Sequence, residues 1–250
     1  MGKKQRRIEF YFVPNFLTLL NVFFGYLSVL STIHENYKWA AFWILIAALM
    51  DAFDGIVARL MKASTEIGIQ LDSLADVISF GAASSFLIYF WGFKSSAPAS
   101  FGLFFSFIFL TGGMLRLARY NTLQKIKPDR KYYVGLTVPS ASLVLAAIVF
   151  FDPQPIKSRL TSLLFAFLVI LLTGCMVSTI KYRNFLYFNP KRRINLRTAF
   201  LYVIVIASVV FFPKILLPAC FFVNFVSGPA EHAFGWLRRQ RQKKVVRQSE

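Results

Sequence analysis

Apolar stretches of about twenty residues, separated by short polar segments, are the feature of this sequence that most restricts its fold. A transmembrane α-helix needs about 20 apolar residues, whereas a strand of a membrane β-barrel needs about ten with alternating polarity. The chain is 56% apolar and only 16% charged, which is too apolar for an ordinary soluble domain of its size. The sequence therefore predicts an all-α integral membrane protein.

We predict about eight membrane-spanning helices from these stretches. Their approximate bounds are 14–33, 38–61, 68–92, 98–122, 134–152, 159–180, 198–213 and 214–236. The predicted organisation is a transmembrane core over residues 1–185, a further C-terminal helical hairpin over residues 186–237 and a basic tail over residues 238–250. An even number of spans places both termini on the same side of the membrane.

The positions of the basic residues predict how the protein lies in the membrane. A net charge of +18 could indicate nucleic-acid binding, but 24 of the 29 Lys and Arg residues fall in a few segments on one side of the predicted spans. These segments are 3–7, 59–62, 116–131, 181–197 and 238–247. Cytoplasmic loops of membrane proteins carry such an excess. We therefore expect a multi-pass protein of a bacterial inner (plasma) membrane, with this side in the cytoplasm and no nucleic-acid partner.

Four aspartates lie towards the cytoplasmic ends of two predicted spans, Asp51 and Asp54 on the second and Asp72 and Asp76 on the third. An aspartate at the bilayer centre costs about 2.5–3.5 kcal/mol on insertion scales, so four of them need a partner. At about 100° per residue, each pair occupies one face of its helix, and the two faces can converge. One divalent cation, or two held about 3.5–4 Å apart, would neutralise the cluster, and oxygen ligands favour Mg²⁺ or Mn²⁺.

Residues beside the aspartates are suited to a bulky ligand that contains phosphate. Gly55, Ala58 and Gly68 lie on the faces that bear the acids and leave room for it. Arg59 faces the same way and could neutralise a phosphate. Thr65 lies in the short turn between the two spans, where its hydroxyl could contact a ligand or cap the next helix.

The segment from residue 51 to residue 76 reads D-x2-D-G-x2-A-R-x8-G-x3-D-x3-D. This pattern resembles the signature of the CDP-alcohol phosphotransferase family. The resemblance implies a six-helix transmembrane core, usually as a homodimer, in which all four aspartates bind metal and Asp76 is also the general base. It also implies contacts to the cytidine nucleotide substrate from residues in the first three spans. These are Asn15, Thr18, Gly55, Ala58, Arg59, Thr65 and Gly68.

Further stretches resemble the phosphatidylserine synthase branch of that family. They are 71–81, 116–121, 135–139 and 176–183, although Ser84 and Thr137 stand where the branch usually has proline. The branch implies transfer of the phosphatidyl group from CDP-diacylglycerol, a membrane lipid, to the hydroxyl of L-serine, with release of CMP. Arg116 and Arg119, at the end of the fourth span, could hold the serine carboxylate or lipid phosphates, or could only anchor the helix at the interface.

Other functions remain open from the sequence. The same chemistry could use glycerol 3-phosphate, inositol or an inositol phosphate, or choline as the acceptor alcohol. An ion or proton transporter could use the same acids, but it predicts helices broken near the middle of the membrane or a paired repeat. A lipid-binding scaffold without turnover is a third possibility. The complete pattern of acids, small residues, Arg59 and Thr65 favours the enzyme.

Overall fold

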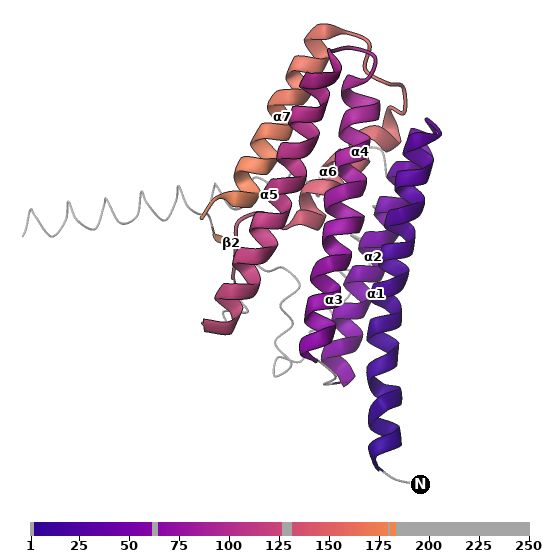
Figure 1. Cartoon of the computed structure of the whole chain (residues 1–250), viewed down its shortest axis with the longest axis vertical. Coiled ribbons are helices and arrows are strands. Elements are labelled where there is room, and N and C mark those ends of the chain that lie inside the picture. Colours follow the sequence, from indigo (N-terminus) through magenta and orange to yellow (C-terminus); the bar gives the residue numbers. More distant parts are fainter. Residues whose placement is uncertain (1–2, 62–64, 127–131, 180, 184–250) are drawn as a thin grey trace, which may run out of the picture.

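A bundle of long helices forms the protein in the computed structural model, which describes residues 3–61, 65–126, 132–179 and 181–183 (Figure 1). The bundle confirms the predicted all-α class. The predicted C-terminal hairpin (186–237), with its spans 198–213 and 214–236, and the basic tail (238–250) lie outside the described residues.

Three consecutive long elements build one part of the bundle. Helices α1 (Lys3–Ile33) and α2 (Tyr37–Met61) form an antiparallel pair joined by a short turn in which Glu35 has a φ of 61°. The third element runs on as one rod, in which α-helical and π-helical segments alternate. Its segments are α3 (Glu66–Asp76), the π-helix η1 (Val77–Ala82), α4 (Ala83–Leu87) and the π-helix η2 (Ile88–Phe93).

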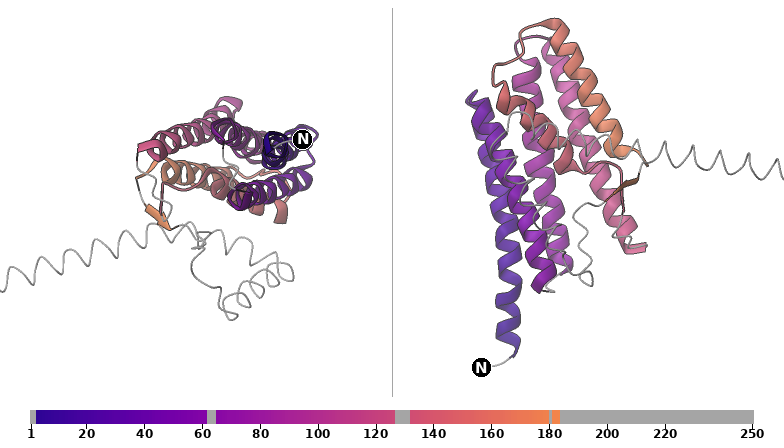
Figure 2. Two further views of the ribbon diagram at one scale, coloured as in Figure 1. Left: turned by 90° about the horizontal axis from the view of Figure 1, so that it is seen from below. Right: turned by 180° about the vertical axis from the view of Figure 1, so that it is seen from behind.

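The remaining helices complete the bundle. They are α5 (Ala99–Ile126), α6 (Val138–Phe151) and α7 (Arg159–Val177). Seen from the end and from behind, α1 and α2 lie at one edge, while α5 and α7 pack side by side at the other (Figure 2). The last residues of α2 (51–61) and the first residues of the rod (66–76) lie at the end of the bundle where α1 begins (Figure 1). We call this end the aspartate end.

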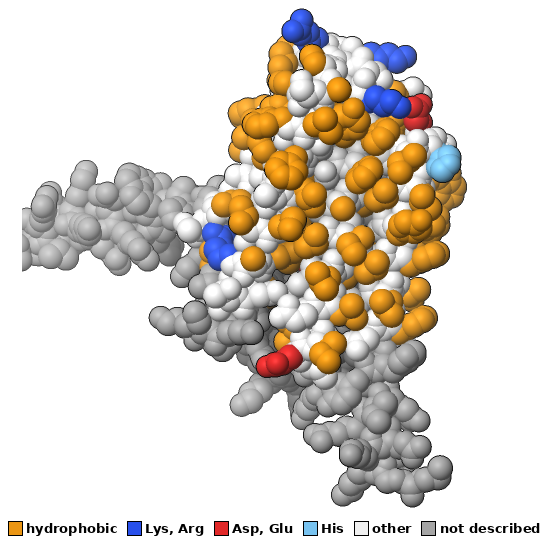
Figure 3. All heavy atoms as spheres, viewed as in Figure 1, with side chains coloured by type: hydrophobic (Ala, Val, Ile, Leu, Met, Phe, Trp, Pro, Cys, Tyr) orange, Lys and Arg blue, Asp and Glu red, His pale blue; other side chains and the backbone are white. Residues whose placement is uncertain are grey.

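Apolar helices of sufficient length identify the chain as a membrane protein. Within the described part of the chain, four segments are long and apolar enough to cross a bilayer: Asn15–Ile33, Glu66–Phe93, Ala99–Thr122 and Arg159–Val177. α2 has 25 residues and carries two of the aspartates, whereas α6 has only 14 residues. On the face shown in Figure 3, apolar side chains cover the middle and charged ones lie mostly towards the ends. This distribution suits contact with lipid.

Two short strands change the predicted bounds of the last two described spans. β1 (Tyr132–Val134) pairs antiparallel with β2 (Lys181–Arg183), so α6 begins at residue 138 instead of 134 and α7 ends at residue 177 instead of 180. Gly135 follows β1 with a φ of 77°, and a Cβ there would collide with the carbonyl oxygen of Met176. The strands therefore need glycine at this turn.

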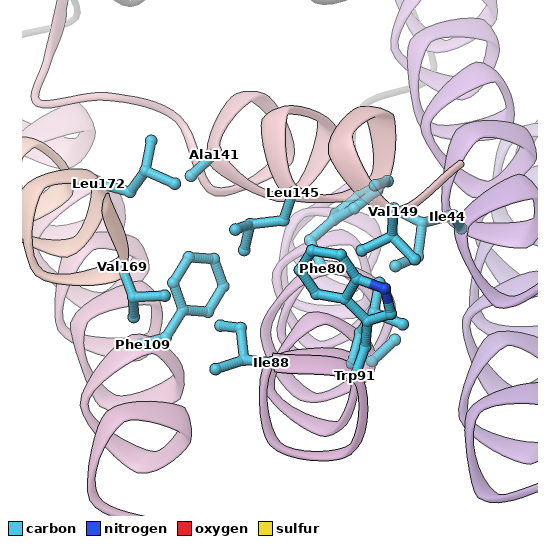
Figure 4. Close-up of a cluster of buried hydrophobic side chains, with 14 of the residues drawn as sticks. Ile44, Phe80, Ile88, Trp91, Phe109, Ala141, Leu145, Val149, Val169 and Leu172 are labelled. Carbon is cyan, nitrogen blue, oxygen red and sulfur yellow. The ribbon is translucent and has the colours of Figure 1, made fainter. Parts of the chain in front are cut away.

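The core lies where α6 crosses the other helices. Leu145 and Val149 of α6 point towards Phe80 and Trp91 of the rod, and Phe109 of α5 lies beside them (Figure 4). All five side chains are buried. This apolar layer fixes η1, and therefore the end of α3 that bears the last aspartate, against the rest of the bundle.

Gly25 of α1 is expected to be essential for the close approach of α1 to η1. A Cβ on Gly25 would lie 2.5 Å from both Cα and Oγ of Ser79, and the backbone atom cannot turn away. We expect Gly25→Ala to destabilise the purified protein by about 1–3 kcal/mol, measured by thermal unfolding in detergent. Gly174→Ala is the matched control, because a Cβ there meets none of the described atoms within 4 Å. It should be neutral or stabilising by up to about 1 kcal/mol; equal losses in both variants would contradict the packing argument.

Candidate active site

Three carboxylates meet at the aspartate end of the bundle. One oxygen from each of Asp51, Asp72 and Asp76 lies within 4.8 Å of the other two. Asp51 comes from α2 and the other two from α3, so two helices supply the cluster, as their helical phases predict. The Asp76 side chain is 8% exposed, and those of the other two are half-buried.

The fourth aspartate lies beside this cluster and is held by α1. Asp54 is buried, and its Oδ2 accepts a hydrogen bond of 2.9 Å from the hydroxyl of Thr18. It interacts electrostatically with Asp51 and Asp72. Thr18 is thus a direct partner of a candidate metal ligand.

The cluster has the chemistry of a cation site. At an effective dielectric constant of about 20, two charged oxygens this close repel by about 3.5 kcal/mol. Oδ1 of Asp76 is also buried without a hydrogen-bond partner among the described residues. Buried polar atoms are normally satisfied. A divalent cation between the three carboxylates would remove the repulsion, and carboxylate oxygens are the ligands that Mg²⁺ and Mn²⁺ prefer.

The small residues near the acids differ in their surroundings. A Cβ on Gly55 would meet no atom of the described residues within 4 Å, so the described structure leaves the face of α2 beside Asp54 open. A Cβ on Gly68 would lie 3.1 Å from Oγ1 of Thr65 and 3.3 Å from Oδ1 of Asn15, so the start of α3 lies close to α1. Space for a bulky ligand is therefore available on the α2 side.

Thr65 caps α3, which is one of its two predicted roles. Its Oγ1 accepts a hydrogen bond of 3.0 Å from the backbone N–H of Gly68. Ala58 and Arg59 continue α2, but their side chains lie outside the part of the structure that is described.

The two predicted arginines of α5 have different partners. Arg116 is 4% exposed, packs over the ring of Tyr120 at 5.1 Å and interacts electrostatically with Asp51 and Asp76. Arg119 instead donates to backbone carbonyls near the end of α7 and in β1. These acceptors are Val177 at 2.7 Å, Ser178 at 2.8 Å, and Met176 and Val134 at 3.4 Å. The structure therefore brings Arg116 to the aspartates, while Arg119 ties α5 to the β1–β2 ribbon.

Two further hydrogen bonds near the site involve residues that the sequence did not assign to it. Nδ2 of Asn121 on α5 donates to Oγ of Ser73 at 2.8 Å, next to Asp72. Oγ of Ser79 donates to the backbone oxygen of Asn21 at 2.9 Å, one turn beyond Asp76. Asn21 follows Thr18 by three residues, and this helical spacing is the signal that could have identified it.

Comparison with known proteins identifies the family. A family model for CDP-alcohol phosphatidyltransferase matches residues 11–210. The CDP-diacylglycerol–serine O-phosphatidyltransferase of Helicobacter pylori is 32% identical over 203 residues, covering 80% of this chain and 82% of the relative. The enzyme of the same name from Bacillus subtilis is 31% identical over 174 residues, covering 70% and 91%. The archaetidylserine synthase of Methanothermobacter thermautotrophicus is 33% identical over 188 residues, covering 73% and 74%.

The family match spans most of the chain and includes both helices that carry the aspartates. The chain therefore belongs to the CDP-alcohol phosphatidyltransferase family of membrane enzymes.

Proposed function

We propose that this enzyme transfers the phosphatidyl group of CDP-diacylglycerol to the hydroxyl of L-serine, producing phosphatidylserine and CMP. The observation that carries the proposal is the meeting of Asp51, Asp72 and Asp76 beside the buried Arg116. It combines a cation site with a positive group suited to a carboxylate. The relatives named as serine phosphatidyltransferases support the choice of acceptor.

The four aspartates would hold the metal. Asp51, Asp72 and Asp76 form the cluster, and Asp54 lies against it. We propose that they bind two ions, either Mg²⁺ or Mn²⁺. Bound there, divalent cations supply positive charge that offsets the charge of the substrate pyrophosphate and of the departing CMP.

Asp76 is proposed as the general base. It accepts the proton of the serine hydroxyl as that oxygen attacks the phosphorus bonded to diacylglycerol. The bond from this phosphorus to the bridging oxygen breaks, and CMP leaves with that oxygen and the bond electrons. No covalent enzyme intermediate is required. Most of the acceleration then comes from positioning and from charge stabilisation, as in other phosphoryl transfers.

The nucleotide would lie against the open side of α2 and the start of α3. We assign its contacts to the small and polar residues that line these elements and α1. They are Asn15, Thr18, Gly55, Ala58, Arg59, Thr65 and Gly68. The space beside Gly55 supports this placement, because a flat base or a phosphate can approach the helix backbone there.

Arg116 is the proposed partner of the acceptor carboxylate. It is buried on α5 and within electrostatic range of Asp76, the proposed base, so a serine held by it would present its hydroxyl near that base. Arg119 was predicted for the same role, but its bonds to backbone carbonyls favour an anchoring function.

We further propose that the enzyme lies in the inner (plasma) membrane with the aspartate end in the cytoplasm. The excess of Lys and Arg on that side supports this orientation. A homodimer is proposed from the family resemblance alone.

CMP release identifies the acceptor. Purified protein with Mg²⁺ or Mn²⁺ should release CMP from CDP-diacylglycerol only when L-serine is present, and phosphatidylserine should appear in equal amount. Inositol, glycerol 3-phosphate and choline are the matched acceptor controls. Release with one of these but not with serine would keep the chemistry and change the acceptor. Substrate-dependent thermal stabilisation without CMP release would instead favour a lipid-binding scaffold, and cation flux without release would favour a transporter.

A further inference from the structure

Asn21 is the most unusual polar side chain near the site. It is completely buried, and neither atom of its amide group has a hydrogen-bond partner within the described part of the chain. An amide buried without partners is costly, and in a membrane protein lipid cannot provide them. An apolar residue of similar size would avoid that cost.

The contacts of α1 place Asn21 at the depth of the innermost acids. One turn before it, Thr18 bonds to Asp54. Its own backbone oxygen accepts from Ser79, which lies one turn beyond Asp76 on the neighbouring rod. Asn21 therefore lies along the turn that separates Asp76 from Ser79.

The positions of the acids on the antiparallel helix α2 indicate the same depth for Asn21. Asp51 lies one turn further into the bundle than Asp54, just as Asn21 lies one turn further in than Thr18. Asn21 is thus level with both Asp51 and Asp76. On this register its side chain lies at the depth of the inner end of the carboxylate cluster.

The hydrogen-bonding groups at this depth are complementary. Oδ1 of Asp76 is buried and lacks a partner among the described residues, and a carboxylate oxygen can only accept. Nδ2 of Asn21 carries two N–H donors and is also unbonded within the described residues. In a site of low dielectric, a bond between such groups is stronger than in water.

We propose that Asn21 is a positioning residue that donates an N–H from Nδ2 to Oδ1 of Asp76 when substrate binds. This role deepens the proposed function and rests on it. The bond fixes the plane of the carboxylate, so that its other oxygen faces the metal site and the acceptor hydroxyl. Catalytic hydrogen bonds often tighten only in the substrate complex. The Ser79 bond holds the backbone of Asn21 in place, so only its side chain needs to adjust.

The kinetic test separates positioning from a structural role. Asn21→Leu removes both polar groups at nearly the same size, and Asn21→Ala removes them together with the rest of the side chain beyond Cβ. We expect each to lower kcat by about 10–100-fold, as for other residues that orient an active-site group. KM for CDP-diacylglycerol should stay within about threefold, and the melting temperature of Asn21→Leu should be unchanged or higher.

Ser28→Ala is the matched control. Ser28 is also completely buried on α1, and its hydroxyl lacks a partner in the described structure, but it lies two turns away from Asn21. It should melt at the same or a higher temperature and keep its kcat. Wild-type kcat in Asn21→Leu, or an equal loss in Ser28→Ala, would overturn the proposal. If Asn21→Leu fails to fold, the kcat of Asn21→Ala tests the proposal alone.

An infrared measurement tests the contact without turnover. With Mg²⁺ and CDP-diacylglycerol but no serine, the difference between wild type and Asp76→Asn marks the carboxyl band of Asp76. Asn21→Leu should shift that band, and Ser28→Ala should leave it in place. An unshifted band would overturn the proposal even if the enzyme is active. Absence of CMP release with serine in the wild type would instead refute the proposed function, and the band test would still report on Asn21.

Discussion

Asp76→Asn is expected to reduce serine-dependent CMP release by about 10²–10⁴-fold, the usual contribution of a general base. The amide keeps the size of the side chain but cannot accept the hydroxyl proton. The loss should persist at saturating Mn²⁺, because added metal restores binding but not the base. Steady-state CMP formation across a Mn²⁺ titration measures both effects.

Two further variants serve as controls for this experiment. Asp152→Asn changes an exposed aspartate that follows α6 at the opposite end of the bundle, and it should keep wild-type activity. Asp51→Asn alters a proposed ligand that is not the base, so high Mn²⁺ should recover part of its activity. Recovery of Asp76→Asn by Mn²⁺ would show that Asp76 acts only as a ligand.

Removal of divalent cations is expected to abolish CMP release completely. The proposed ligands Asp51, Asp72 and Asp76 lie so close together that their charges repel without a cation between them. Treatment with EDTA should stop the reaction, and readdition of Mg²⁺ or Mn²⁺, but not of K⁺, should restore it. Activity that survives thorough chelation would exclude the metal-dependent mechanism.

The same repulsion predicts a crossover in stability. Without metal, Asp51→Asn should melt at a higher temperature than wild type, because one repelling charge is gone. With Mn²⁺ the order should reverse, since a ligand at about 100 times its dissociation constant stabilises the wild type by about 2.7 kcal/mol. Thermal unfolding in detergent with EDTA or Mn²⁺ measures this order. A destabilised Asp51→Asn under both conditions would mean that the aspartate has a structural role instead.

The carboxylate cluster could be predicted because helix periodicity is a local property. The spacings 51–54 and 72–76 place each pair on one helix face, and apolar surroundings require those faces to turn inward together. In the structure, one carboxylate oxygen from each of Asp51, Asp72 and Asp76 lies within 4.8 Å of the other two. Asp54 could be assigned to the site from its spacing. Its hydrogen bond with Thr18 could not be predicted, because the two residues are 36 positions apart.

The different partners of the two arginines could not be predicted. Arg116 and Arg119 are three residues apart on one helix, and both are basic residues near its end. Which of them meets the acids depends on how α5 is rotated against α3 and α7. The carbonyl acceptors of Arg119 also arise from a strand pairing between residues 132–134 and 181–183, which no local pattern indicates.

By itself, the sequence determined that this is a helical membrane protein and that its acids share one site, because hydropathy and helix phase are set residue by residue. Only the tertiary structure decided what surrounds those acids. The approach of α1 to η1 at Gly25, the bond from Thr18 to Asp54 and the burial of Asn21 against Ser79 depend on how separate helices pack. Such packing is governed by side-chain shape across the whole bundle, since lipid provides little hydrophobic force between helices and leaves close contact to decide their register.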